Sequence, residues 1–66
     1  MPVRLKLRGK EFEVRAGMTV RQALLHLGLA PEALLATRHG ELITEDEILR
    51  EGDEIRLVAV ISGGGN

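Results

Sequence analysis

Residues 54–61 read EIRLVAVI, and this stretch decides the fold. Its alternate positions form two sets, of which the first is wholly apolar: Ile55, Leu57, Ala59 and Ile61. The second set comprises Glu54, Arg56, Val58 and Val60. Successive side chains of a β-strand point to opposite faces of a sheet, so the pattern predicts a strand whose first set faces a core. It is the longest strand that the sequence predicts.

The beginning of the chain carries the same alternation. Residues 3–7 read VRLKL, in which apolar side chains are separated by cations, and this predicts a half-buried strand. Gly9-Lys10 predicts a turn, and residues 11–15 (EFEVR) continue the alternation as the second strand of a hairpin. Because the strands at the two ends of the chain are strongly patterned, we expect them to lie parallel at the centre of the sheet.

A single helix is predicted after this hairpin. Thr19 and Gln22 have the spacing of a capping box, in which each side chain binds the backbone N–H of the other residue. One apolar face follows at helical spacing: Val20, Ala23, Leu24 and Leu27. Gly28 suits the left-handed residue that ends a helix, and Pro31 prevents the helix from continuing. We therefore expect a helix over residues 20–27.

Two shorter strands are predicted after the helix. Residues 34–37 form an apolar run, and residues 42–43 follow it after a turn. A second Thr-x-x-Glu sequence at residues 44–47 predicts a single helical turn that carries Ile48 and Leu49 inward.

This order of elements indicates one fold class. A helix inserted between hairpin-like pairs must cover one face of the sheet, because a single helical stripe cannot bury itself alone. We predict an α+β fold, a β-grasp (ubiquitin-like) roll, with a mixed four- to five-stranded sheet packed on one helix. The domain should occupy residues 1–61, and residues 62–66, Ser-Gly-Gly-Gly-Asn, should form a flexible C-terminal tail.

Composition narrows the range of functions. The 66 residues suffice for one domain, and without Cys the chain has no disulfide and no thiolate metal ligand. A net charge of −1 and a single aromatic residue give no reason to expect direct nucleic-acid binding. The apolar runs are too short to span a bilayer, and we expect a cytoplasmic protein. His26 and His39 are too few for a metal site, and we find no catalytic set.

The last predicted strand runs directly into the glycines, and here a resemblance becomes specific. Residues 51–64, EGDEIRLVAVISGG, combine a Gly-Asp turn, an apolar strand and a Gly-Gly pair. This combination resembles the C-terminal signature of the ubiquitin-like sulfur carriers. That family includes the thiamine-pathway carrier ThiS, the molybdopterin synthase small subunit MoaD and the carriers used for tRNA thiolation. The resemblance covers the whole chain in length and strand order.

The resemblance implies a carrier protein and not an enzyme. In this family an E1-like adenylating enzyme supplies Mg-ATP, and the carrier's terminal glycine carboxylate attacks the α-phosphate to give an acyl-adenylate. Sulfur from a donor of desulfurase or rhodanese type then displaces AMP, and the resulting thiocarboxylate passes its sulfur to a sulfur-accepting synthase. By this resemblance the reactive C-terminus lies among Gly63, Gly64 and Gly65, and the carrier itself binds no cofactor. Residues 38–47 favour tRNA thiolation as the destination, ahead of thiamine and molybdopterin synthesis.

A docking face for these partners is predicted beside the tail. If the first set of the last strand faces the helix, Val58 and Val60 lie on the opposite sheet face, where exposed β-branched side chains favour a hydrophobic partner. Arg56 on the same face would set specificity, and Ser62 begins the tail. We expect Arg56, Val58, Val60 and Ser62 to contact the partner.

Gly65 and Asn66 depart from the family pattern, in which mature chains usually end at the second glycine. Trimming by a processing protease, residues left by cloning, and a pseudo-carrier are three explanations. Two other functions also stay open. One is a ubiquitin-like modifier joined to lysines through its glycine carboxyl, and the other is a non-catalytic β-grasp binding module that does not depend on the tail.

Overall fold

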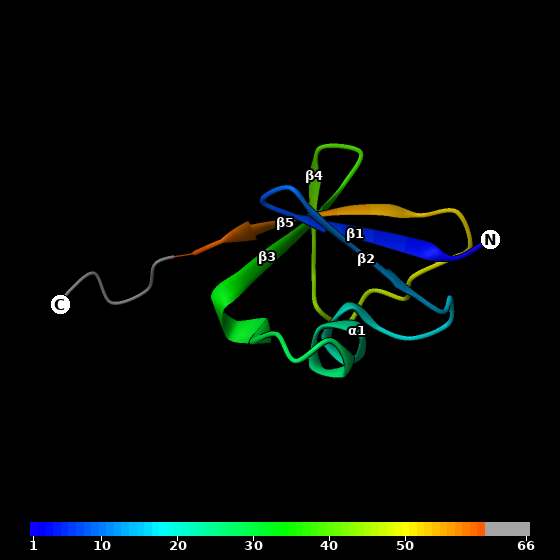
Figure 1. The fold of residues 1–66 in the computed structure, drawn as a ribbon, viewed down its shortest axis with the longest axis horizontal. Helices are drawn as coiled ribbons and strands as arrows, with labels where there is room; N and C mark the ends of the chain where they lie inside the picture. Colours follow the sequence, from blue (N-terminus) through cyan, green and yellow to red (C-terminus); the bar gives the residue numbers. More distant parts are fainter. Residues whose placement is uncertain (61–66) are drawn as a thin grey trace, which may run out of the picture.

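A five-stranded mixed sheet with a single helix on one face makes up the fold (Figure 1). The computed structural model describes residues 1–60. The strands are β1 (Val3–Leu7), β2 (Lys10–Val14), β3 (Leu34–Arg38), β4 (Glu41–Ile43) and β5 (Glu54–Ala59). The helical elements are α1 (Val20–His26) and the short 3-10 turn η1 (Pro31–Ala33). No helix in the described part is long and apolar enough to cross a membrane.

β1 and β5 lie side by side and parallel at the centre of the sheet, as the sequence predicted. The strand order is β2-β1-β5-β3-β4, and the other neighbouring pairs are antiparallel. In the central pair Leu5 lies beside Ile55, and Leu7 lies beside Leu57. Both strands have neighbours on two sides, which satisfies their backbone groups within the sheet. This topology confirms the predicted β-grasp class.

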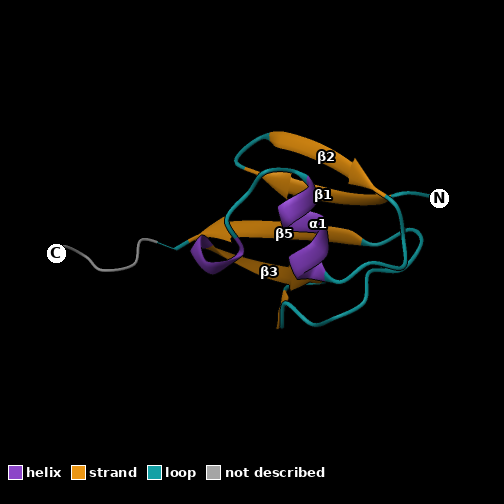
Figure 2. Ribbon diagram, turned by 90° about the horizontal axis from the view of Figure 1, so that it is seen from below, coloured by secondary structure: helices purple, strands orange, loops and turns teal. Residues whose placement is uncertain are grey.

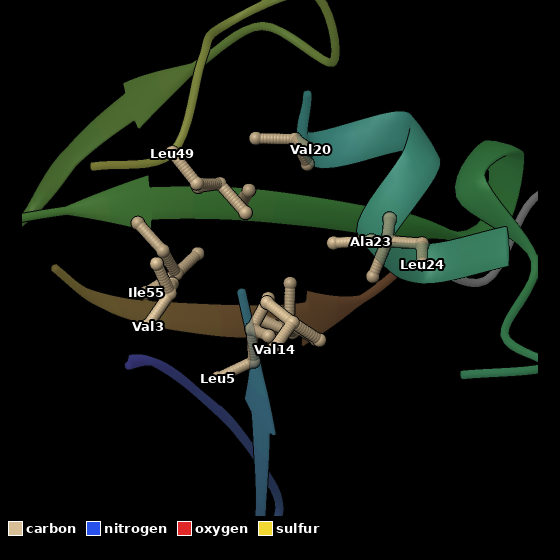
Figure 3. Close-up of a cluster of buried hydrophobic side chains, with 10 residues drawn as sticks. Val3, Leu5, Val14, Val20, Ala23, Leu24, Leu49 and Ile55 are labelled. Carbon is tan, nitrogen blue, oxygen red and sulfur yellow. The ribbon is translucent and has the colours of Figure 1, made fainter. Parts of the chain in front are cut away.

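The core lies between α1 and the inner face of the sheet (Figure 2; Figure 3). α1 contributes Val20, Ala23 and Leu24, which are the buried part of its predicted apolar face. The strands and loops supply the other buried hydrophobic side chains: Val3, Leu5, Val14, Ala36, Leu49, Ile55 and Leu57. Among residues 1–60 no polar or charged residue is fully buried, so apolar burial is the main stabilising contribution here.

The backbone groups at both ends of α1 are satisfied as predicted. Thr19 Oγ1 accepts a hydrogen bond from Gln22 N at 3.1 Å, and Gln22 Oε1 accepts one from Thr19 N at 2.9 Å. At the other end Gly28 has a φ of 77°, and Leu29 N donates to Leu24 O at 2.8 Å. This is the hydrogen bonding of a Schellman cap. The helix is one residue shorter than predicted, because the residue before Gly28 serves as the C-cap.

Two tight turns join β1 to β2 and β3 to β4, and the first lies one residue earlier than predicted. Arg8 and Gly9 form it, with φ of 54° and 90°, whereas Lys10 already pairs with Leu7 in the ladder. A two-residue hairpin turn that matches the strand twist needs positive φ at both central residues. The turn between β3 and β4 has the same geometry, with φ of 54° and 80°.

The segment between β4 and β5 does not form the helical turn that its Thr-x-x-Glu sequence predicted. Residues 44–47 make an ordinary turn instead, in which Glu47 N donates to Thr44 O at 3.1 Å. Leu49 is fully buried, but Ile48, which was predicted to point inward, is 45% exposed. In extended chain, successive side chains point to opposite sides, so only one of these two enters the core.

Hydrogen bonds to the start of α1 explain why this segment is not helical. Val20 N donates to Glu47 O at 3.0 Å, and Arg21 N donates to Glu45 O at 3.0 Å. The first N–H groups of a helix have no partner within the helix, and here carbonyl groups of the segment accept from them. A helical turn at this point would place those carbonyls differently, so tertiary hydrogen bonds override the local capping sequence.

An ion cluster holds the end of the same segment to β3. Arg38 donates to Glu47 Oε2 at 3.1 Å and to Asp53 Oδ2 at 2.8 Å. It also donates to the Ile48 carbonyl at 3.0 Å, and Asp53 accepts from Arg50 N at 2.8 Å. Burial acts to lower the pKa of Arg38, but the hydrogen bonds and charges of Glu47 and Asp53 raise it above its ordinary value. The Gly-Asp turn therefore has a structural use at the start of β5.

We expect Asp53→Ala to lower the free energy of unfolding by about 2 kcal/mol, because it leaves the part-buried Arg38 without its shortest partner. Urea denaturation measures the change. Asp46→Ala is the matched control, since Asp46 is exposed, and it should change stability by less than about 0.5 kcal/mol. Equal stability of the two variants would contradict a stabilising role for the cluster.

Candidate functional site

The last described residue, Val60, lies at the end of the sheet where β1 and β5 both finish (Figure 1). Val60 N donates to Ala33 O at 2.9 Å, which ties this point of the chain to η1. The predicted reactive and tail residues lie outside the described part: Ser62, Gly63, Gly64 and Gly65. The structure thus fixes the point from which the glycines continue.

Of the other predicted docking residues, Arg56 and Val58 lie on the sheet face opposite α1, which we call the outer face. Along β5, Ile55 and Leu57 are buried, whereas Arg56 and Val58 are exposed. The exposed fraction is 46% for Val58 and 38% for Val60. The strand therefore presents Arg56 and Val58 to solvent, and Val60, just after the strand, is also exposed.

Ala59 departs from the predicted inward set. It is exposed, although Ile55 and Leu57 of the same set are buried. Ala59 pairs with Leu34 near the end of the sheet, where β5 has run past α1 (Figure 2). The alternation sets which way a side chain points, but burial also needs an element on that side to cover it. Ile61, the last member of the set, lies outside the described residues.

Two leucines that the sequence reasoning missed extend the exposed surface. Leu35 lies opposite Val58 and is 45% exposed, and Leu42 lies opposite Thr37 and is 66% exposed. Together with Val60 they form what we call the apolar patch: Leu35, Leu42, Val58 and Val60. Residues 34–37 were interpreted as a continuous apolar run. Assigning the buried Ala36 to the core by period two would have placed Leu35 outside.

Side chains with metal-binding or acid-base chemistry are scattered over the rest of the described part. Within residues 1–60 there is no group of three or more His, Cys, Asp or Glu that could hold a metal ion. His26 ends α1 and is exposed, and His39 lies in the turn between β3 and β4.

The apolar patch is the feature of this surface that points to a function. An exposed apolar patch of this kind is typical of a surface that binds another protein.

Comparison with known proteins identifies a family and curated relatives. Residues 3–64 match the model of the ThiS family, so the match includes Gly63 and Gly64. Among curated proteins, the chain is similar to sulfur carrier protein TtuB of Thermus thermophilus, with 42% identity over 55 residues. The aligned part covers 83% of this chain and 85% of that protein.

Solved structures agree on the fold. The N-terminal ubiquitin-like domain of the 4931431F19Rik protein has a TM-score of 0.69 at 19% identity, covering 100% of this chain and 80% of that one. Caldiarchaeum subterraneum ubiquitin has a TM-score of 0.63 at 20% identity, covering 97% and 98%. SAMP1 of Haloferax volcanii has a TM-score of 0.65 at 24% identity, covering 97% and 100%. At these identities the likeness concerns the fold alone.

We expect Val58→Thr to change the free energy of unfolding by less than about 0.5 kcal/mol, because the side chain is on the outer face and threonine also favours strands. Leu57→Thr, one position away on the buried face, should cost more than about 2 kcal/mol. Urea denaturation of both variants tests the assignment of faces. Equal losses would mean that Val58 packs against the core.

Proposed function

The chain belongs to the ThiS family, and from that membership we propose how it works as a sulfur carrier. It is a carrier protein and not an enzyme, so each chemical step takes place on a partner. The observation that carries the proposal is the family match over residues 3–64. The matched stretch includes β5, whose end is exposed, and the Gly63-Gly64 pair that follows it in the sequence.

The proposed cycle begins at the C-terminal glycine. Its carboxylate attacks the α-phosphorus of ATP on an E1-like enzyme, pyrophosphate leaves, and an acyl-adenylate forms. A persulfide on a donor of desulfurase or rhodanese type then attacks the acyl carbon, AMP leaves, and an acyl–S–S bond joins carrier and donor. A second thiol attacks the donor's own sulfur, forms a disulfide with it, and releases the thiocarboxylate on the carrier. ATP and Mg²⁺ belong to the activating enzyme in this cycle.

Glycine suits a chain end that must enter another protein. Without a Cβ it fits a narrow channel and adopts backbone angles that other residues avoid. Extended at ~3.3–3.6 Å per residue, residues 61–64 span roughly 13–14 Å beyond Val60. In this proposal residues 1–61 form the docking domain, and residues 62–66 are the tail, of which Gly64 or Gly65 becomes the reactive end.

The apolar patch and its neighbours form the proposed docking surface for the activating enzyme. Val58 and Val60 lie directly before the tail, and Leu35 lies opposite Val58. Docking of the patch on the activating enzyme would bring the reactive glycine close to the bound ATP, because only a few residues separate this glycine from Val60. Arg56 adds a positive charge to this surface, and Ser62 is the proposed docking residue nearest to the C-terminus in the sequence.

The remaining partners follow from the cycle. A sulfur-accepting synthase receives the thiocarboxylate, and a processing protease would expose Gly64 or Gly65. We place the cycle in the cytoplasm. The resemblance of residues 38–47 to the tRNA-thiolation carriers favours thiolation of tRNA, with thiamine synthesis and then molybdopterin synthesis as the next destinations.

We expect the untagged protein purified from its own host to end at Gly64 or Gly65, with one oxygen replaced by sulfur in part of the population. Intact mass spectrometry measures both features. A variant lacking residues 63–66 keeps every described residue, so it should fold but carry no sulfur. A mass that ends at Asn66 in every growth condition would contradict the cycle. Gly-Gly adducts on lysines of other proteins would indicate a modifier.

We expect Val58→Asp to raise the KM of the activating enzyme for the carrier about tenfold or more with kcat unchanged, because it places a charge in the apolar patch. Leu25→Asp is the matched control, since Leu25 is 54% exposed on α1, which covers the other face of the sheet. Pyrophosphate exchange measures both variants. The same KM for the two would remove the patch from the docking surface.

A further inference from the structure

Four of the nine Lys and Arg side chains of the chain gather where β1 turns into β2. Lys6, Arg8, Lys10 and Arg56 line one open hollow there, and Glu11 is the one carboxylate residue among the described residues that line it. We call these four side chains the cationic strip. Lys6 and Arg56 lie opposite each other on β1 and β5, and both also line a second hollow together with His39 and Glu54.

The carboxylate residues beside the cationic strip among residues 1–60, Glu11 and Glu54, offset only part of its charge. Lys6 Nζ lies 3.7 Å from Glu11 Oε2, with exposed side-chain fractions of 41% and 55%, and an exposed pair of this kind contributes little. Within residues 1–60, Arg8, Lys10 and Arg56 form no ion pair. The whole chain carries a net charge of −1, so this end of the sheet reverses the overall sign.

The cationic strip is continuous with the apolar patch. Arg56 and Val58 are alternate residues on the same face of β5, and Leu35 follows across the next ladder. The exposed surface therefore changes in chemistry along β5: cations lie around Arg56 and the β1–β2 turn, and apolar side chains lie around Val58, with Leu35 of β3 and Leu42 of β4. Lys6, Arg56 and Val58 lie on the outer face, whereas Lys10 pairs with Leu7, which packs against the core, and Arg8 lies in the turn at the same end of the sheet.

Given the proposed function, we infer that the cationic strip docks on a carboxylate-rich surface of the adenylating enzyme, at the mouth of the channel that takes the tail. Opposite charges around an apolar contact accelerate association and fix its register. The partner's surface is acidic where it meets the cationic strip, and apolar where it meets the apolar patch. An RNA partner fits less well, because half of the surface is apolar and Phe12 is the one aromatic residue for stacking.

A pair of charge-matched double variants tests this inference by pyrophosphate exchange. Arg8→Asp with Arg56→Glu reverses two cations of the strip, and aspartate tolerates the positive φ of Arg8. Arg15→Glu with Arg50→Glu makes the same change in net charge at two exposed positions. Arg15 follows the end of β2 and Arg50 precedes the start of β5, so both lie away from the β1–β2 turn. Thermal melting establishes that both fold, and Arg8→Asn with Arg56→Gln is a milder second variant.

We expect the strip variant to lower kcat/KM by about 10- to 100-fold at low salt, with kcat unchanged, and the control variant by less than about threefold. Added NaCl should lower kcat/KM of the wild type and leave that of the strip variant nearly constant. Equal losses and equal salt dependence in the two variants would overturn the inference. The inference would also be overturned if the wild type bound tRNA, the strip variant alone lost this binding, and the adenylating enzyme still activated the strip variant normally. Absence of exchange with the wild-type carrier would overturn the proposed function, and the inference with it.

Discussion

The parallel pairing of β1 with β5 is the constraint on which the rest of the structure depends. It joins the first and last strands in the middle of the sheet, and it supplies Val3, Leu5, Ile55 and Leu57 to the core. Because the two strands run in the same direction, their carboxyl ends coincide at one end of the molecule. The β1–β2 turn and the end of β5 are therefore neighbours in space, although they come from opposite ends of the sequence.

The two ends of β5 have different tasks. At its start, Asp53 and Arg38 fasten the segment between β4 and β5, and that segment in turn supplies carbonyl partners to the first N–H groups of α1. At its other end the strand runs past α1 and exposes its side chains. Among residues 1–60, the ion cluster of Arg38 lies at the start of β5, whereas exposed apolar and cationic groups lie around its end.

Patterns that depend on near neighbours were predictable from the sequence. The alternation around Leu57 located the central strand, Thr19 and Gln22 located the helix start, and the family resemblance, carried by the glycines, is confirmed. The capping sequence at residues 44–47 led to a wrong prediction. Backbone N–H groups of α1, which are distant in the sequence, bind carbonyls that a local helical turn would have used. Leu35 and Leu42 were missed because short strands show too few alternations to tell two faces apart. The geometry of the glycines remains a prediction, since they lie outside the described residues.

Contacts between sequence-distant residues also have a consequence for synthesis on the ribosome. Until β5 has emerged, β1 has only β2 beside it, and a two-stranded hairpin is marginal in water. Closing the loop between the two strands is the slow, entropically costly step of such a topology. A nascent chain that lacks β5 therefore has neither a sheet centre nor an ordered outer face. Only chains that have been synthesised through β5 can fold, because the sheet centre needs this strand. Any molecule with a formed sheet therefore already carries the strand that leads to the reactive end.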